Sequence, residues 1–248
     1  MLQTFAGGTL FGSVTGPDAP RVLALHGWAR THRDFDAVIG PAGQPPLPAL
    51  ALDLPGFGAS PPPSVAWGAA GYAQAVGQLL DEMEGPVVVL GHSFGGRVAL
   101  HLANQRPASI RALILTGVPL LHPLGRRARV APAFKAMRRL HRMKLVSDAT
   151  MEAARQRYGS ADYKAAQGIM RQIHVRSVNE TYEAQLDAVQ CPVHMVWGAD
   201  DTAAPVEVAE RAVARIAHGD LVVYPGGGHL TPLLIPSELR AVVVSCLN

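Results

Sequence analysis

The chain alternates short runs of apolar residues with longer segments in which apolar and polar positions recur at helical spacing. The apolar runs are rich in valine, leucine and isoleucine, and each leads into a loop that contains glycine. Continuous apolar strands of this kind are typical of a parallel sheet with helices on both faces. The sequence therefore predicts an α/β fold. We expect its strands at residues 21–25, 50–54, 87–90, 110–115, 193–197 and 221–224, with an edge strand or hairpin at residues 5–14.

One long stretch, residues 122–186, breaks this alternation. It holds no convincing strand and is rich in alanine, arginine, methionine, glutamine and glutamate, which indicates several helices. A single crossover helix needs far fewer residues. We therefore predict that residues 122–186 form a helical lid, inserted into a core domain made of residues 1–121 and 187–248. The alternative is that these helices are further layers on the sheet.

Composition and charge limit the classes of partner. The 248 residues suit one large domain, or one domain with an insertion. The net charge of +3 is too small to indicate nucleic-acid binding, and no stretch approaches the apolar length of a membrane span. We expect neither a nucleic-acid nor a membrane partner. Without signal-peptide features at the N-terminus, a cytoplasmic location is expected, and without metal-ligand spacing no metal is expected.

The most informative motif is Gly91-His92-Ser93-Phe94-Gly95. It follows the apolar run at residues 87–90 and precedes a helix-like segment at residues 97–103. A serine at a sharp strand–turn–helix junction is pushed out of the backbone, and the turn leaves room only for small neighbours. The sequence therefore predicts a nucleophile elbow, with Ser93 as the catalytic nucleophile.

A serine hydroxyl needs a base to become reactive, and the base needs a group that orients it. His229 is the predicted base, because it follows a strand and a flexible run of glycines. Asp201 is the predicted acid, since it lies in the loop after the strand at residues 193–197. The adjacent Asp200 is the alternative acid, and we expect it to form a turn or begin a helix. The chain order serine, aspartate, histidine is the order of the elbow architecture.

The negative oxygen that forms during acyl transfer needs fixed hydrogen-bond donors. One predicted donor is the backbone N–H of Phe94, directly after the nucleophile. The other is the backbone N–H of Trp28, in the loop after an early strand, where Gly27 permits close approach. The indole of Trp28 has two interpretations, a wall of the acyl pocket or a plain packing role.

Together with these residues, the motifs Leu25-His26-Gly27-Trp28 and Asp53-Leu54-Pro55-Gly56-Phe57-Gly58 make the sequence resemble the α/β-hydrolase superfamily. The resemblance implies an eight-stranded, mostly parallel sheet, a triad without cofactor, and a helical lid after the sixth strand. It also implies a serine-dependent carboxylic ester hydrolase that works through an acyl-enzyme. Arg30 departs from the family pattern, because many relatives carry glycine there, and we expect a differently shaped oxyanion loop.

Two other classes of function stay open. One is a different reaction of the same triad: hydrolysis of carbon–carbon bonds, perhydrolysis, iminopeptidase action or lyase chemistry. The other is a non-enzymatic member that binds a small molecule. The complete set Ser93, Asp201 and His229 argues against the second, since binding alone does not require it.

The predicted lid is strongly basic, with eight lysines or arginines and no acidic residue between Leu121 and Ser147. These charges indicate either a solvated helix or a surface for an acidic partner or anionic substrate. The early motifs also resemble the pimeloyl-acyl-carrier-protein methyl ester esterases of biotin synthesis. That resemblance implies a small acyl ester substrate and an acidic carrier protein that docks on a basic lid. The residues expected to bind substrate are Trp28, Phe134, Met137, Arg138 and Arg142.

Overall fold

The computed structural model describes residues 2–124 and 132–248, and its centre is one eight-stranded sheet. The strand order is β1-β2-β4-β3-β5-β6-β7-β8. Strand β2 runs antiparallel to both of its neighbours, and all other pairs are parallel. The predicted mostly parallel sheet is thus confirmed. The strands are β1 Leu2–Phe5, β2 Leu10–Thr15, β3 Val22–Leu25, β4 Ala49–Asp53, β5 Val87–His92, β6 Ile110–Thr116, β7 Val193–Gly198 and β8 Gly219–Tyr224.

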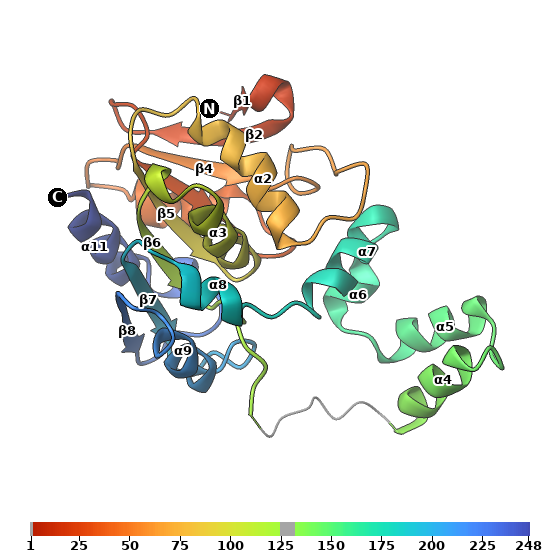
Figure 1. The fold of residues 1–248 in the computed structure, drawn as a ribbon. Helices are drawn as coiled ribbons and strands as arrows, with labels where there is room; N and C mark the ends of the chain where they lie inside the picture. Colours follow the sequence, from red (N-terminus) through yellow and green to blue (C-terminus); the bar gives the residue numbers. More distant parts are fainter. Residues whose placement is uncertain (1, 125–131) are drawn as a thin grey trace.

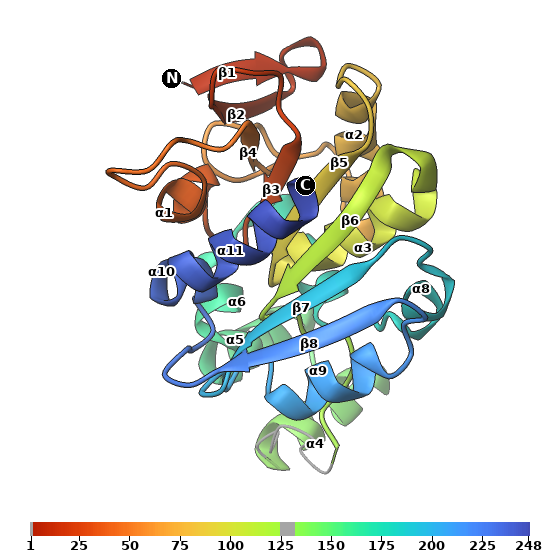
Figure 2. The same cartoon turned by 90° about the vertical axis from the view of Figure 1, so that its left-hand side faces the viewer.

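Both faces of the sheet are buried, because successive side chains of a strand point to opposite sides. In β3, Leu23 and Leu25 belong to one apolar cluster, and Val22 and Ala24 to the other. Helices α2, α3, α8 and α9 cover the first cluster, and α1 and α11 cover the second (Figures 1 and 2). These helices are α1 Asp36–Ile39, α2 Ala69–Leu80, α3 Phe94–Gln105, α8 Glu183–Ala188, α9 Val206–Val213 and α11 Pro236–Leu247, with the short elements η1 Ala6–Gly8, η2 His32–Phe35, η3 Pro107–Ser109 and α10 Thr231–Leu234.

A helical insertion, α4 to α8, connects β6 to β7. Helices α4 and α5 form a hairpin that lies away from the sheet, and α6 and α7 lie between that hairpin and the body of the molecule (Figure 1). No helix in the described ranges is both long and apolar enough to cross a membrane. Residues 125–131 of the predicted lid, which include the basic residues Arg126, Arg127 and Arg129, lie outside the described residues. The remaining helices are α4 Pro132–Arg142, α5 Asp148–Tyr158, α6 Ala161–Ala165 and α7 Gly168–Ser177.

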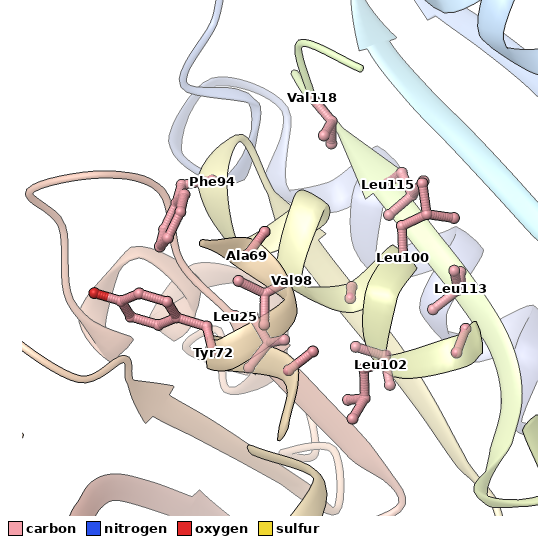
Figure 3. Packing of buried hydrophobic residues seen from close by; sticks show 14 of the residues in the cluster. Leu25, Ala69, Tyr72, Phe94, Val98, Leu100, Leu102, Leu113, Leu115 and Val118 are labelled. Carbon is pink, nitrogen blue, oxygen red and sulfur yellow. The ribbon is translucent and has the colours of Figure 1, made fainter. Parts of the chain in front are cut away.

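Aromatic packing holds the first turn of α3 in place. The rings of Phe94 and Tyr72 meet edge to face, with their centroids 5.0 Å apart (Figure 3). The Tyr72 hydroxyl donates a hydrogen bond of 3.0 Å to the carbonyl oxygen of Pro55, and burial raises the pKa of this phenol. The start of α3 is therefore anchored both to α2 and to the loop after β4.

Candidate active site

Ser93 occupies the sharp turn between β5 and α3. Its backbone angles, φ 49° and ψ −112°, lie in a region that residues with a side chain rarely adopt. Its glycine neighbours make the turn possible. A Cβ atom on Gly95 would overlap the carbonyl oxygen of Leu25, and one on Gly91 would lie 2.5 Å from the Cα of Gly96. The motif thus holds its serine in a strained conformation that only very small neighbours permit.

We expect the replacement Gly95→Ala to lower the free energy of unfolding by about 3 kcal/mol, because the new methyl group overlaps rigid backbone. Gly40→Ala is the matched control, since φ at Gly40 is −145° and a Cβ there meets nothing closer than 3.9 Å. Thermal and urea unfolding of the two variants measure the difference. Equal stabilities would contradict the steric explanation.

Three side chains from loops at the carboxyl ends of the strands meet beside this turn. The Nε2 atom of His229 lies 3.1 Å from the Oγ atom of Ser93. The Nδ1 atom of the same imidazole lies 2.9 Å from the Oδ2 atom of Asp201. With the imidazole proton on Nδ1, this nitrogen donates to the carboxylate and Nε2 is free to accept the serine proton. The arrangement is a continuous line of hydrogen bonds from a buried carboxylate to a hydroxyl.

The structure brings Asp201, and not Asp200, to the imidazole. The Asp201 side chain is fully buried, and its Oδ1 atom accepts hydrogen bonds from the backbone N–H groups of Ala203 and Ala204, at 2.9 Å and 2.8 Å. Asp200 is exposed, and its backbone N–H donates to the carbonyl of Gly227. The loop therefore points one carboxylate inward with a fixed orientation and leaves the other in solvent.

The two predicted oxyanion donors lie on adjoining segments. A Cβ atom on Gly27 would lie 3.3 Å from the Cβ of Ser93, so the loop after β3 passes directly beside the elbow. Phe94 is the first residue of α3, where a backbone N–H has no partner within the helix. Within residues 2–124 and 132–248, the N–H groups of Trp28 and Phe94 donate to no protein acceptor. Neither N–H group is therefore committed to another group in this part of the chain, as the predicted role requires.

Arg30, which departs from the family pattern, forms a bidentate ion pair with Asp34. Its Nε and Nη2 atoms donate to the carboxylate at 2.8 Å and 2.6 Å, and this hydrogen bonding raises the pKa of the guanidinium. The preceding residue, Ala29, adopts φ 55°. The loop therefore turns through an alanine in the left-handed region, next to an arginine that is held by an ion pair.

Two buried histidines connect the loops of the site. His92 donates from Nε2 to the carbonyl of His229 at 2.8 Å, and the Nε2 of His26 accepts the backbone N–H of Leu54 at 3.0 Å. Burial lowers the pKa of His26 to about 4. For His92, burial and then the nearby charge of His229 also lower the pKa to about 4. Both rings are therefore neutral at physiological pH.

These two histidines should make the fold sensitive to acid. Their pKa values are about 6.5 in the unfolded chain, so between pH 6.5 and 4 the unfolded state binds more protons and stability falls as the pH is lowered. Each histidine contributes at most about 1.4 kcal/mol per pH unit. Urea unfolding across this interval should show a shallower pH dependence for His92→Met than for the wild type. His218→Met, at an exposed position, is the control. If the stability of His92→Met depended on pH as steeply as that of the wild type, the argument would be contradicted.

Ser93 opens into a cavity of 170 Å³. A larger cavity of 540 Å³ lies between α4, α5, α6 and α7, and shares His174 and Val178 with the first. Of the residues expected to bind substrate, Trp28 lines the cavity at Ser93, whereas Phe134 and Arg138 line the larger one. Met137 is half-buried, Arg142 is exposed, and neither lines these two cavities. The cavity at Ser93 is lined by Trp28, Ser93, Phe94, Arg97, Pro119, Asp162, His174, Ser177, Val178, Ala203 and His229.

Sequence reasoning missed Arg97, which lies one helical turn after the serine and forms part of the cavity wall. Its buried guanidinium donates to the carbonyls of Ser177 and Pro119, at 2.7 Å and 2.9 Å. An arginine among the small and apolar residues of the elbow helix was a signal that could have singled it out. His174 and Asp162 carried no such signal, because only folding of the helical insertion brings them to the cavity.

The sequence profile of the alpha/beta hydrolase family matches residues 22–243, so the chain belongs to this family. A pimeloyl-[acyl-carrier protein] methyl ester esterase of Aromatoleum aromaticum is 28% identical over 91% of this chain and 96% of that protein. Lipase LipV of Mycobacterium tuberculosis is 43% identical over 102 residues, which span 40% of this chain and 38% of that lipase. Family and relatives together identify the chain as a hydrolase with esterase- and lipase-type relatives.

Solved structures show the same fold at lower sequence identity. The thioesterase domain from the curacin biosynthetic pathway superposes with a TM-score of 0.70 at 20% identity, and covers 98% of both chains. A hydrolase from Pseudomonas aeruginosa PA01 superposes with a TM-score of 0.72 at 23% identity, over 100% of this chain and 98% of that one. The predicted α/β-hydrolase fold is thereby confirmed.

Proposed function

We propose that the protein is a serine-dependent carboxylic ester hydrolase with Ser93 as nucleophile, His229 as base and Asp201 as orienting acid. The observation that carries this proposal is the line of hydrogen bonds from Asp201 through His229 to Ser93. The strained backbone of Ser93 supports it, because such strain is typical of a residue held for reaction.

The mechanism follows from this geometry. His229 takes the Ser93 proton at Nε2 while Oγ attacks the acyl carbon, and the backbone N–H groups of Trp28 and Phe94 hold the developing oxyanion. Asp201 stabilises the imidazolium. The imidazolium then gives its proton to the departing alcohol oxygen, which leaves the acyl group bonded to Oγ. Water releases the acid by the same steps, with His229 as base once more.

We propose that residues 122–186 form a lid over a core domain made of residues 1–121 and 187–248. The support is that His174 and Ser177 of α7 line the cavity at Ser93. Arg97, on the elbow helix of the core, also donates to the Ser177 carbonyl and so joins the two parts. Helices α4 and α5 also lie away from the sheet, whereas further layers would lie on its face (Figure 1).

Within the class of ester hydrolases, we infer that the substrate is a pimeloyl-acyl-carrier-protein methyl ester, which would place the reaction in biotin synthesis in the cytoplasm. The names and the full-length coverage of the relatives support this substrate. Helix α4 adds charge complementarity to an acidic carrier, since its exposed cations recur at positions i, i+3, i+4 and i+7 and so form one stripe. These residues are Lys135, Arg138, Arg139 and Arg142.

Removing part of this stripe should weaken the binding of the carrier-linked substrate and leave the binding of the free ester unchanged. We expect Arg139→Gln combined with Arg142→Gln to raise KM for the carrier-linked methyl ester about tenfold, and to leave KM for free dimethyl pimelate unchanged. The double variant Arg33→Gln and Arg215→Gln removes the same charge from exposed core positions and is the control. Equal KM values for all three proteins would argue against docking on α4.

The substrate class is tested with purified full-length protein and a panel of compounds. p-Nitrophenyl esters of increasing acyl length test ester hydrolysis, and carrier-linked and free methyl esters test the specific assignment. Ring-cleavage diketones, peroxide with an acid, and aminoacyl amides test carbon–carbon hydrolysis, perhydrolysis and iminopeptidase action. Turnover confined to one of the last three would replace ester hydrolysis with that reaction, and binding without turnover of any compound would favour a non-enzymatic member.

A further inference from the structure

The imidazole of His92, which the proposed reaction does not use, lies where the loops of the site meet. It belongs to the last residue of β5, next to the proposed nucleophile, and is only 1% exposed. Its side chain cannot reach solvent and has no direct role in proton transfer to the substrate. A buried polar ring in such a place requires a structural reason.

The first contact of this ring is with the base. The Nε2 atom of His92 donates to the backbone carbonyl of His229 over 2.8 Å, and the two imidazoles lie with their centroids 5.1 Å apart. Because the loop of His229 is rich in glycine, few side chains restrain its backbone. The hydrogen bond from His92 therefore fixes the main chain of the residue that must accept the serine proton.

The second contact is with the oxyanion loop. A Cβ atom built on Gly27 would lie 2.9 Å from the Nδ1 atom of His92 and 3.1 Å from its Cε1 atom, so the ring fills the space beside this glycine. Gly27 directly precedes Trp28, whose N–H is a proposed oxyanion donor. The ring of His92 thus separates the base loop from the oxyanion loop and sets the distance between them.

The remaining nitrogen explains why the ring stays neutral. Among the described residues, the buried Nδ1 atom of His92 has no hydrogen-bond partner. A proton on this atom would leave an unpaired buried charge, next to the imidazolium that His229 becomes during the reaction. A ring with its proton on Nε2 provides the one donor that the His229 carbonyl needs and adds no repulsive charge.

We propose that His92 is a positioning residue, which holds the backbone of His229 and the loop of Gly27 at the spacing that catalysis requires. This inference rests on the proposed serine mechanism. A displacement of about 1 Å in a catalytic group lowers rates by about a hundredfold. His92 therefore acts on the rate of the chemical step and not on substrate binding.

The test compares His92→Met, which fills similar space without a donor, with His92→Gln, whose amide nitrogen lies near the position of the imidazole Nε2. We expect His92→Met to lower kcat about 30- to 100-fold with KM changed less than about twofold. His92→Gln should recover activity to within about fivefold of the wild type. The exposed His218→Met is the matched control and should match the wild type.

A second measurement follows Ser93 directly, through its rate of labelling by a fluorophosphonate. Here Oγ bonds to phosphorus, fluoride leaves, and His229 takes the hydroxyl proton. We expect labelling to slow with His92→Met and to recover with His92→Gln. If kcat and the labelling rate were the same in both His92 variants and the wild type, the positioning role would be overturned and the serine mechanism would stand. If Ser93→Ala left the activity of the enzyme unchanged, the serine mechanism itself would be refuted. If His92→Met lost activity and His92→Gln did not restore it, the proposed role of the Nε2 hydrogen-bond donor would also be overturned.

Discussion

Replacing Ser93 with alanine should lower kcat for a p-nitrophenyl ester by about four to six orders of magnitude. The alanine has no oxygen to form the acyl-enzyme, so only the oxyanion donors and substrate binding remain to accelerate hydrolysis. Steady-state and burst-phase kinetics measure the loss. The fold should persist, since the side chain of Ser93 contributes one hydrogen bond, to His229, at the wall of an open cavity.

The double variant Ser93→Ala with His229→Ala provides a sharp control. Residues that act as one unit give strongly non-additive losses, so the second replacement should cost little once the first is made. If the two losses multiplied instead, serine and histidine would act in separate steps. A single Ser93→Ala variant with nearly full activity would refute the proposed nucleophile.

The second large effect is expected at Asp201. Changing Asp201 to asparagine should lower kcat by about four orders of magnitude, because an amide nitrogen facing Nδ1 favours the wrong imidazole tautomer. KM should change little, since the buried carboxylate does not line the cavity.

Asp200→Asn is the matched control, because it makes the same chemical change one residue away on an exposed side chain. We expect its kcat to stay within about twofold of the wild type. The opposite outcome, with Asp200→Asn inactive and Asp201→Asn active, would reverse the assignment of the acid.

Much of the fold was predictable, because strongly apolar strands that end in glycine loops leave few alternatives. The expected strand at residues 87–90 is β5, Val87–His92, and the expected strand at residues 193–197 is β7, Val193–Gly198. Both differ from prediction only at their ends, where the polar or small residues that lead into a site continue the ladder. Their sequence pattern was strong because both faces of each strand are buried.

The cavity could not be predicted in the same way. Phe134 and Arg138 were singled out by helical spacing, and they line a cavity adjacent to the one at Ser93. Arg97 and His174 line the cavity at Ser93 itself. Spacing indicates which residues share a face of one helix, but it carries no information on how several short helices pack against a sheet.

By itself, the sequence determined the local chemistry: an elbow that only glycine neighbours permit, and an acid and a base that each follow a strand. Local steric rules and the alternation of side chains are sufficient for those conclusions. Only the tertiary structure decided which aspartate faces the imidazole, that His92 contacts the loops on both sides of the nucleophile, and which residues of the helical insertion reach the cavity. These features depend on contacts between segments that are far apart in the sequence, or on the rotation of one loop. Neither produces a periodic pattern in the sequence.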